Sequence, residues 1–386
     1  MELNVRLLTA RVPRLFSAVC LVALCTPAQA QFNPNPTLAI GDAAPAFTPQ
    51  AWVRGQPLSG FRKGRVHVVD FWATWCGGCV MSFPRISGIA EQYRDRVTFV
   101  SVDSYEGLGE NKGKDPVALV KAFLATPSGK KLTLDVAVDG PGNPLFQAWI
   151  KPLRRGGFPT TFIVDQEGRI AWIDVNLDHL TWALDQVLAG TWDSAKARDV
   201  MQGRDAAEDA MIASFKVQGP AHDKALREML ARAEAFEAQF PDRKDAVAFY
   251  KFMALLELDP GRLPGILEQM ASDPLSRYLN LHDAAAMSLR RDDLPRAAYT
   301  AIVKVLERCL HNPDMAPNTG GSPSALLGEI ASAHQKAGDT GKALVTLRRA
   351  VQAANAEQAP KATLEGLQKR LAQVEPSASG KAPAHP

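Results

Sequence analysis

The chain has 386 residues, 46% of them hydrophobic and 22% charged. This composition excludes disorder throughout, and at roughly 100–200 residues per domain the length predicts two domains. The chain carries 44 basic and 41 acidic side chains, and residues 1–30 hold three arginines and one glutamate, so the rest has 41 basic and 40 acidic. A chain so close to neutrality has no general electrostatic attraction for nucleic acid or an anionic membrane surface, and we expect neither partner.

The first 30 residues have the pattern of an export signal. A basic region runs to Arg14, an apolar run covers residues 15–24, and Ala28 and Ala30 supply the small side chains that a signal peptidase requires. An apolar run of about ten residues is well short of the ~20 needed to span a bilayer. We therefore expect cleavage near Gln31 and a periplasmic or secreted protein with no membrane span after signal removal.

Two further features concern the start of the chain. A lipid anchor on Cys25 is disfavoured because the bulky Leu24 precedes it where a small residue is wanted. Residues 31–37, rich in Pro and Asn, are predicted to be disordered.

From residue 38 to residue 192, short β-branched and aromatic runs alternate with helical stretches, which is typical of an α/β fold. Strands are predicted over residues 66–72, 97–102, 134–138, 160–164 and 169–174. Helices are predicted over residues 76–93, 117–125, 144–150 and 177–188. The strand–helix–strand unit predicts a parallel pair, and the turn at residues 165–168 predicts an antiparallel hairpin at the edge. The result is a mixed sheet with flanking helices.

Residues 193–375 contain almost no strand-like runs and are predicted to form an all-α domain. Over residues 327–350, a Gly–Asp turn and small side chains at Ala331, Ala343 and Ala350 resemble a tetratricopeptide repeat. A weaker copy covers residues 284–304, with small positions predicted at Ala297 and Ala301. This helical repeat-like domain could bind a protein partner or serve as a scaffold, and residues 376–386 are predicted to be a disordered tail.

Five cysteines are present, and the spacing of one pair points to redox chemistry. Cys76 falls at the start of a predicted helix, where unpaired N–H groups and the helix dipole favour a thiolate. Cys79 lies one helical turn further on, close enough to close a disulfide. The first thiolate could attack a disulfide of a partner, and the second could then resolve the mixed disulfide. Cys309, between two leucines, is predicted to be a small buried hydrophobe.

The sequence VDFWATWCGGC at residues 69–79 resembles a thioredoxin active site, and GFPTTF at residues 157–162 resembles the cis-proline loop of that fold. The segments LAIGDAAPAF (residues 38–47) and FIVDQEGRI (residues 162–170) are similar to the exported TlpA-like branch of thiol–disulfide reductases. The resemblance covers about residues 38–190. It implies a thioredoxin fold for residues 38–192.

The resemblance also implies catalytic roles. Cys76 would be the exposed nucleophile and Cys79 the buried resolving thiol. Asp70 takes the place of the buried carboxylate that handles the proton of the resolving thiol. Burial should raise the pKa of this carboxyl, which suits it to acid–base work near neutrality.

Substrate contacts are implied for Pro159 and Thr160, with Pro159 cis and its strand edge pairing with the substrate backbone. Trp75 would shield the disulfide from one side, and Trp75 and Phe158 could either contact substrate or serve in packing. The substrates would be protein thiols and disulfides, with an upstream electron donor. No cofactor and no metal is expected, because the Cys76–Cys79 disulfide itself carries the electrons. His179 is interpreted as an ordinary surface or turn residue.

Two departures from the family pattern leave details open. Gly77-Gly78 separates the cysteines where many relatives carry Pro at the second position, so the redox potential cannot be read from the sequence. Ser82 stands where TlpA-like proteins often have Glu, which weakens an assignment to cytochrome c maturation.

Other interpretations of the cysteine pair are disfavoured. Zinc would need a second pair of ligands, and haem attachment would need His at the position of Val80. A peroxiredoxin-like antioxidant enzyme would have Pro and Thr at the positions of Val69 and Ala73. An inert structural disulfide would not require the tryptophans or the proline. The sequence therefore predicts an exported protein thiol–disulfide oxidoreductase, with a reductase favoured. The alternative is a partner-binding protein whose helical array is the functional surface.

Overall fold

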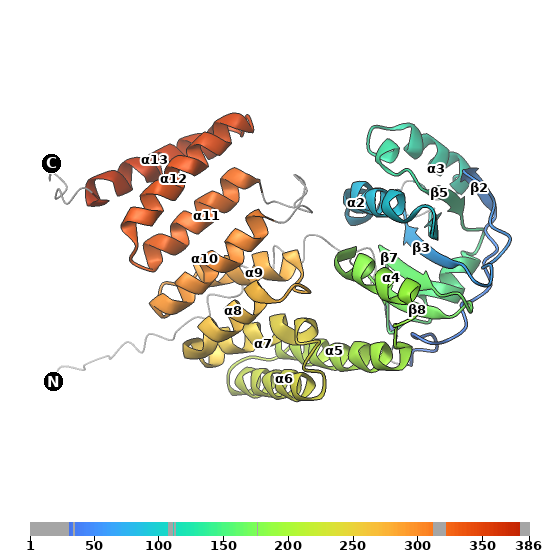
Figure 1. The fold of residues 1–386 in the computed structure, drawn as a ribbon, viewed down its shortest axis with the longest axis horizontal. Coiled ribbons are helices and arrows are strands. Elements are labelled where there is room, and N and C mark those ends of the chain that lie inside the picture. Colours follow the sequence, from blue (N-terminus) through green and yellow to red (C-terminus); the bar gives the residue numbers. More distant parts are fainter. Residues whose placement is uncertain are drawn as a thin grey trace, which may run out of the picture. The chain divides into compact units, whose positions relative to one another are not determined.

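The computed structural model describes residues 31–33, 35–106, 111, 113–175, 177–311 and 322–378. The predicted export signal and the end of the predicted tail, residues 379–386, lie outside these residues. The chain divides into two compact units, Met1–Leu177 and Asp178–Pro386 (Figure 1). This division precedes the predicted domain boundary after residue 192, so the last predicted helix of the α/β region is grouped with the helical unit.

The first unit has a six-stranded sheet in the order β2-β5-β4-β3-β7-β8. Strand β3 pairs in parallel with β4, and β4 pairs in parallel with β5, whereas the other neighbours are antiparallel. The predicted parallel pair and late hairpin are thus confirmed, and the mixed sheet with flanking helices is a thioredoxin fold. The edge strand β2 was not predicted. The strands are β2 (Ala51–Arg54), β3 (Val66–Trp72), β4 (Val97–Asp103), β5 (Asp135–Val138), β7 (Thr160–Val164) and β8 (Ile170–Asp174).

One face of the sheet is covered by helices α2 (Gly77–Tyr93) and α3 (Pro116–Ala125). Trp72, the last residue of β3, packs against Phe83 of α2 and Phe123 of α3, with ring centroids 5.0 and 5.5 Å apart. Successive residues of a strand point to opposite faces of the sheet. Trp72 therefore points to the face that α2 and α3 cover, and it packs between the two helices.

The opposite face carries a second aromatic cluster. Phe71 packs against Trp149 and Phe162, at centroid distances of 5.8 and 5.7 Å. Trp149 belongs to η3 (Phe146–Ile150), a single turn of π-helix where a short helix was predicted. Every residue of β3 is buried, as expected of a strand that is covered on both faces. A short 3₁₀ turn, η2 (Gly129–Lys131), precedes β5.

The predicted disorder of residues 31–37 does not agree with the structure. Strand β1 (Gln31–Phe32) pairs antiparallel with β6 (Arg155–Gly156). The Asn33 N–H donates to the Arg154 carbonyl at 2.8 Å, and the Thr37 N–H donates to the Pro152 carbonyl at 3.0 Å. These hydrogen-bond partners lie more than a hundred residues away in the sequence. They hold residues whose composition alone predicts disorder.

The second unit is helical, and from α5 to α13 helices that are neighbours in the sequence pack against each other (Figure 1). Its elements are η4 (Leu177–His179, at the boundary), α4 (Leu180–Ala189), α5 (Ser194–Ser214), α6 (Pro220–Gln239), α7 (Asp245–Leu258), η5 (Pro260–Arg262), α8 (Leu263–Ser272), α9 (Tyr278–Leu289), α10 (Arg296–Leu310), α11 (Pro323–Lys336), α12 (Thr340–Ala356) and α13 (Lys361–Ala378). Residues 376–378, predicted as the start of a disordered tail, are part of α13.

The α11–α12 hairpin follows the sequence pattern. The turn contains Gly338 in the left-handed region, and the Asp339 side chain accepts a hydrogen bond from the Lys342 N–H at the start of α12. All three predicted small residues of this hairpin are buried. In the weaker copy Ala301 is buried, but Ala297 is exposed and the small buried position belongs to Ala298.

Cys309 lies in α10 within the main hydrophobic cluster of this unit and is fully buried. Burial raises the pKa of its thiol to about 12, so it remains protonated and unreactive at neutral pH. The prediction of a small buried hydrophobe is confirmed.

The beginning of α4 is held by other residues of the helical unit. The ring of His179 is buried, with Nε2 2.6 Å from the Leu275 carbonyl and 3.8 Å from Asp245. The Arg243 guanidinium lies over the Trp182 ring, 4.8 Å from its centroid. The interpretation of His179 as a surface residue is therefore wrong.

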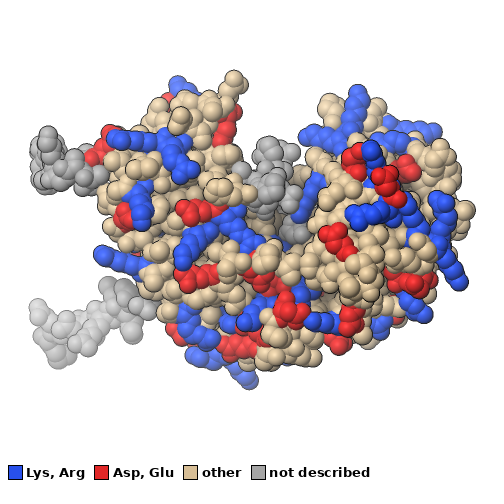
Figure 2. Space-filling view, in the orientation of Figure 1, with Lys and Arg blue, Asp and Glu red and all other residues tan. Residues whose placement is uncertain are grey.

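Figure 2 shows basic and acidic side chains interspersed over the visible surface of each unit. This matches the near balance of charge in the sequence. Within the described part of the chain, no helix combines the length and apolarity that a membrane crossing requires.

Candidate active site

The site begins where the redox loop, residues 73–76 between β3 and α2, meets the helix. Cys76 is the N-cap of the helix, with extended backbone angles, and the Cys79 N–H donates to its Sγ at 3.2 Å. The two residues form a disulfide with their Cα atoms 5.3 Å apart. Cys76 is 6% exposed and Cys79 1% exposed, and Gly77 and Gly78 between them are exposed. An incoming sulfur therefore has better access to Cys76, which fits its predicted role as nucleophile.

Asp70 lies within β3, buried between two neighbouring strands. Its Oδ1 accepts a hydrogen bond from the Thr161 hydroxyl on β7 at 2.7 Å, and Ser101 of β4 lies opposite it in the parallel register. Burial raises the pKa of Asp70 to about 7, against the opposing effect of the hydroxyl groups of Thr161 and Ser101. This carboxyl can therefore both bind and release a proton near neutrality.

The cis-proline loop lies beside the redox loop. The Phe158–Pro159 peptide bond is cis, and a Cβ placed on Gly78 would lie 4.0 Å from Pro159 Cδ. Pro159 is partly exposed, whereas Phe158 and Thr160 are buried. The Thr160 hydroxyl donates to the Gly157 carbonyl at 2.8 Å. The structure thus brings these residues to the disulfide, and their contacts with substrate remain predictions.

An aromatic series connects the two loops. Trp75, which is half-buried, packs against Phe158 at 5.9 Å, Phe158 against Phe146 at 5.7 Å, and Phe146 against Tyr105 at 4.7 Å. The Trp75 indole N–H then donates to the Tyr105 carbonyl at 3.2 Å, which closes a ring of contacts. The sequence alone did not predict Tyr105 and Phe146 as members of the site.

The acidic residues Asp103 and Glu106, which contact the redox loop from the end of β4, were not predicted from the sequence. A usable signal existed, because side chains at the carboxyl ends of neighbouring parallel strands meet at one edge of a sheet. Among the described residues, no group of three or more His, Cys, Asp or Glu is placed to hold a metal ion. Ser82 donates its hydroxyl to the Cys79 carbonyl at 2.7 Å.

Comparisons with known proteins match the part of the chain that contains this site. The Redoxin family model matches residues 39–187. Protein FixW of Rhizobium leguminosarum is 31% identical over 157 residues, which cover 40% of this chain and 69% of FixW. The thiol:disulfide interchange protein HelX of Rhodobacter capsulatus is 31% identical over 179 residues, which cover 43% of this chain and 88% of HelX.

Two further comparisons match a similar share of the chain. The thiol-disulfide oxidoreductase ResA of Bacillus thuringiensis is 27% identical over 164 residues, which cover 40% of this chain and 84% of ResA. A solved structure of a thiol-disulfide isomerase from Corynebacterium glutamicum, 24% identical, aligns with 38% of this chain and 97% of its own length, at a TM-score of 0.32. With its redox loop, disulfide and cis-proline loop in the matched region, the chain belongs to the thioredoxin-fold family of protein thiol–disulfide oxidoreductases.

Proposed function

We propose that the protein is an exported reductase that passes two electrons from the Cys76–Cys79 dithiol to a disulfide of a protein partner. The Cys76 thiolate attacks one sulfur of the partner disulfide, and the other partner sulfur leaves as a thiolate that takes a proton from water. Cys79 then gives its proton to Asp70 and attacks Cys76 Sγ. The second partner thiolate leaves, the partner is reduced, and an upstream dithiol donor reduces the Cys76–Cys79 disulfide again.

The dipeptide between the cysteines is the observation that favours the reducing direction. In strongly oxidising relatives of this fold, the reduced form is stabilised. Here Gly77 and Gly78 bring no charged side chain to the Cys76 sulfur, which accepts a hydrogen bond from the Cys79 N–H. Stabilisation by the helix terminus alone, with no charged side chain from the dipeptide, favours the disulfide form over the dithiol, and that makes the dithiol a reductant.

The test is the reduction potential of the Cys76–Cys79 couple, measured by equilibration of the full chain with glutathione and with dithiothreitol. We expect a value nearer to the about −270 mV of thioredoxin than to the about −120 mV of the strong oxidant DsbA. A value near the second figure would overturn the reducing direction. Consumption of hydrogen peroxide that depends on Cys76 would instead favour the peroxiredoxin-like alternative.

Export is tested separately by N-terminal sequencing of the protein from the periplasmic fraction. We expect a mature chain that starts at Gln31, because Ala28 and Ala30 provide the cleavage signal. The variant Cys25→Ser is the matched control, and it should be processed like the wild type. Processing that requires Cys25 and leaves the protein in the membrane fraction would show a lipid anchor.

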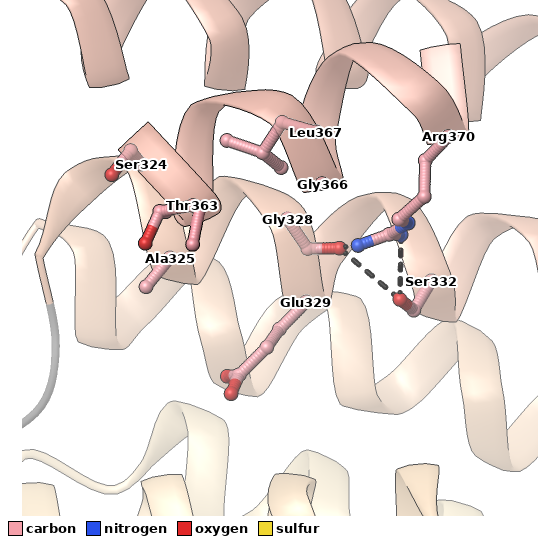
Figure 3. Close-up of a pocket in the computed structure, with 10 residues that line it drawn as sticks. Ser324, Ala325, Gly328, Glu329, Ser332, Thr363, Gly366, Leu367 and Arg370 are labelled. Atoms are coloured by element: carbon pink, nitrogen blue, oxygen red, sulfur yellow. Dashed lines mark hydrogen bonds between the residues drawn. The ribbon is translucent and has the colours of Figure 1, made fainter. Parts of the chain in front are cut away.

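A second candidate function, partner binding by the helical unit, is favoured by a pocket between α11 and α13. The pocket has a volume of about 300 Å³ (Figure 3). The Arg370 guanidinium lies at one end, donating to the Gly328 carbonyl at 3.0 Å and to the Ser332 hydroxyl at 2.8 Å. Burial lowers the pKa of Arg370, and Glu329, which also lines the pocket, pairs with His282 at 3.4 Å. A partly desolvated guanidinium of this kind suits a carboxylate of a protein partner.

Fluorescence anisotropy with a labelled hexaglutamate peptide tests this function, and a hexaglutamine peptide serves as the uncharged probe. We expect the full chain to bind only the acidic peptide and Arg370→Gln to lose that binding. Arg349→Gln, which changes an exposed arginine on α12, is the matched control and should bind like the wild type. Equal binding by wild type and Arg370→Gln would exclude the pocket as the site.

A further inference from the structure

Residues 104–106 form the corner that follows β4, and they bind the redox loop at the two consecutive residues before Cys76. Glu106 accepts hydrogen bonds from the Thr74 N–H at 2.7 Å and from the Thr74 hydroxyl at 2.9 Å. The Tyr105 carbonyl accepts the indole N–H of Trp75 at 3.2 Å. The segment that leads into the nucleophile is therefore held by side chain and main chain of one corner.

This corner is itself fixed from below. The Ser104 N–H donates to the Trp72 carbonyl at 2.9 Å, and the Ser104 hydroxyl donates to Asp139 at 2.6 Å. The Tyr105 N–H donates to the Asn143 side chain at 3.0 Å. Tyr105 has a φ of 65°, a conformation that side-chain-bearing residues rarely adopt. Such a conformation persists only where its surroundings enforce it, and it is concentrated at functional sites.

Asp103 supports Glu106 from the end of β4. Its side chain is fully buried beside the Thr74 N–H, which donates its well-formed hydrogen bond to Glu106 instead. Burial, with the carboxyl groups of Glu106 and Asp139 adding to it, raises the pKa of Asp103 well above its ordinary value. The raised pKa favours the protonated form of Asp103, against the opposing effect of the Thr74 N–H, and a protonated carboxyl can donate to the Glu106 carboxylate.

We propose that Glu106 is a positioning residue for thiol–disulfide exchange, which holds the loop of residues 73–76 so that the Cys76 sulfur meets the incoming disulfide in line. The chemistry requires this because exchange proceeds by attack of one sulfur along the axis of another bond, and small misplacements of a reacting atom cost large factors in rate. The inference rests on the oxidoreductase activity of the family, and not on the direction of electron flow or on export.

The experiment measures the rate at which the reduced full-length protein attacks 5,5′-dithiobis(2-nitrobenzoate), over pH 6–9. Glu106→Ala removes two hydrogen bonds to a charged acceptor, and we expect it to slow the reaction about tenfold or more. Glu106→Gln keeps an oxygen acceptor for the Thr74 N–H, and we expect it to stay within about threefold of wild type. Glu91→Ala, which changes an exposed glutamate of the same unit, is the matched control and should not change the rate.

A second pair of variants keeps the test valid if Glu106→Ala does not fold. Thr74→Val removes the hydroxyl donor and should slow the attack about threefold, and Thr74→Ser should restore the wild-type rate. In the double variant Thr74→Val/Glu106→Ala, the rate should equal that of Glu106→Ala alone, because both changes break one interaction.

Three outcomes would overturn the inference. The first is a lowered melting temperature of Glu106→Ala with an unchanged rate of attack, which would show a purely structural role. The second is equal slowing by Glu106→Gln and Glu106→Ala, which would show that the charge acts and not the position. The third is a wild-type rate for Thr74→Val. An unexpected potential of the wild type would refute the reducing direction but would leave these rate ratios intact.

Discussion

Replacement of Asp70 by Asn tests the proton transfer in the reaction. The substitution keeps the shape of the side chain, and the amide oxygen can still accept the hydrogen bond from Thr161. It removes the one group in this strand whose pKa lies at about 7. Two consequences can be measured independently, one on stability and one on rate.

The stability effect has a defined sign. The pKa of Asp70 is raised from its ordinary value of 3.8 to about 7 in the folded protein, which corresponds to roughly 4 kcal/mol at about 1.4 kcal/mol per pH unit. Between these two values the folded state holds a proton that the unfolded state has lost, so the wild type loses stability as pH rises from about 4 to 7. Asp70→Asn lacks this loss. We expect it to unfold at a higher urea concentration than wild type at pH 8 and at a similar one at pH 4.

The rate effect concerns the second step. Cys79 is buried and must give up its proton before it attacks the mixed disulfide on Cys76. General base catalysis contributes typically about 10²–10⁴-fold, so Asp70→Asn should slow resolution by about 10²-fold or more near neutral pH. The first attack by Cys76 should change much less. Stopped-flow fluorescence of a mixed disulfide formed on Cys76 separates the two steps.

Thr161→Val provides the matched control because it leaves the carboxyl in place and removes its hydrogen bond. That bond lowers the pKa of Asp70, so the variant should move the inflection of the pH–rate profile upward from about 7 without abolishing it. Wild-type rates of resolution by Asp70→Asn across pH 6–9 would refute the reasoning, and the proton would then leave through water.

Three further outcomes are expected. Iodoacetamide should label Cys76 before Cys79 in the reduced native protein, as mapped by mass spectrometry, and the reverse order would exchange their roles. Glu329→Gln should lower the free energy of unfolding by about 1 kcal/mol below pH 6.5 and by little at pH 9. The reason is that Glu329 raises the pKa of His282, so its stabilising contribution is lost as pH rises through that raised pKa. Equal losses of stability in urea titrations at both pH values would contradict this expectation. A chain that ends at Thr191 should keep exchange activity but melt at a lower temperature, and recovery only as aggregate would show that the two units cannot be separated.

The strands and the redox motif could be predicted because their signals are local. Strand β3 is covered on both faces, so its residues form a short, mainly apolar run that ends directly at the redox loop. The two cysteines then fall at the N-cap and in the first turn of a helix, so their spacing alone predicts that they can close a disulfide. The prediction of a raised pKa for Asp70 followed from one charged side chain in an otherwise apolar strand.

The remaining features depend on partners that are distant in the sequence. The burial of His179 requires a carbonyl at Leu275, and the grip on Thr74 requires Glu106 to come from the end of another strand. The edge strand β2 has four half-buried residues and, among the described strands, pairs with β5 alone, so it lacks the apolar pattern of the central strands. The periodic pattern of apolar residues predicts helices and strands, but it does not predict which distant loops come into contact.

Helix α4 restricts how this protein can be divided and recombined. Its residues up to 187 fall within the Redoxin match, yet the compact helical unit already begins at Asp178. A recombination point between residues 187 and 194 lies after the Redoxin match and before α5, so the sequence alone suggests that it does no harm. It would nevertheless separate His179 from Leu275 and the Trp182 ring from Arg243. A chimeric protein that joins the helical unit to another thioredoxin fold must therefore include α4 to keep these contacts.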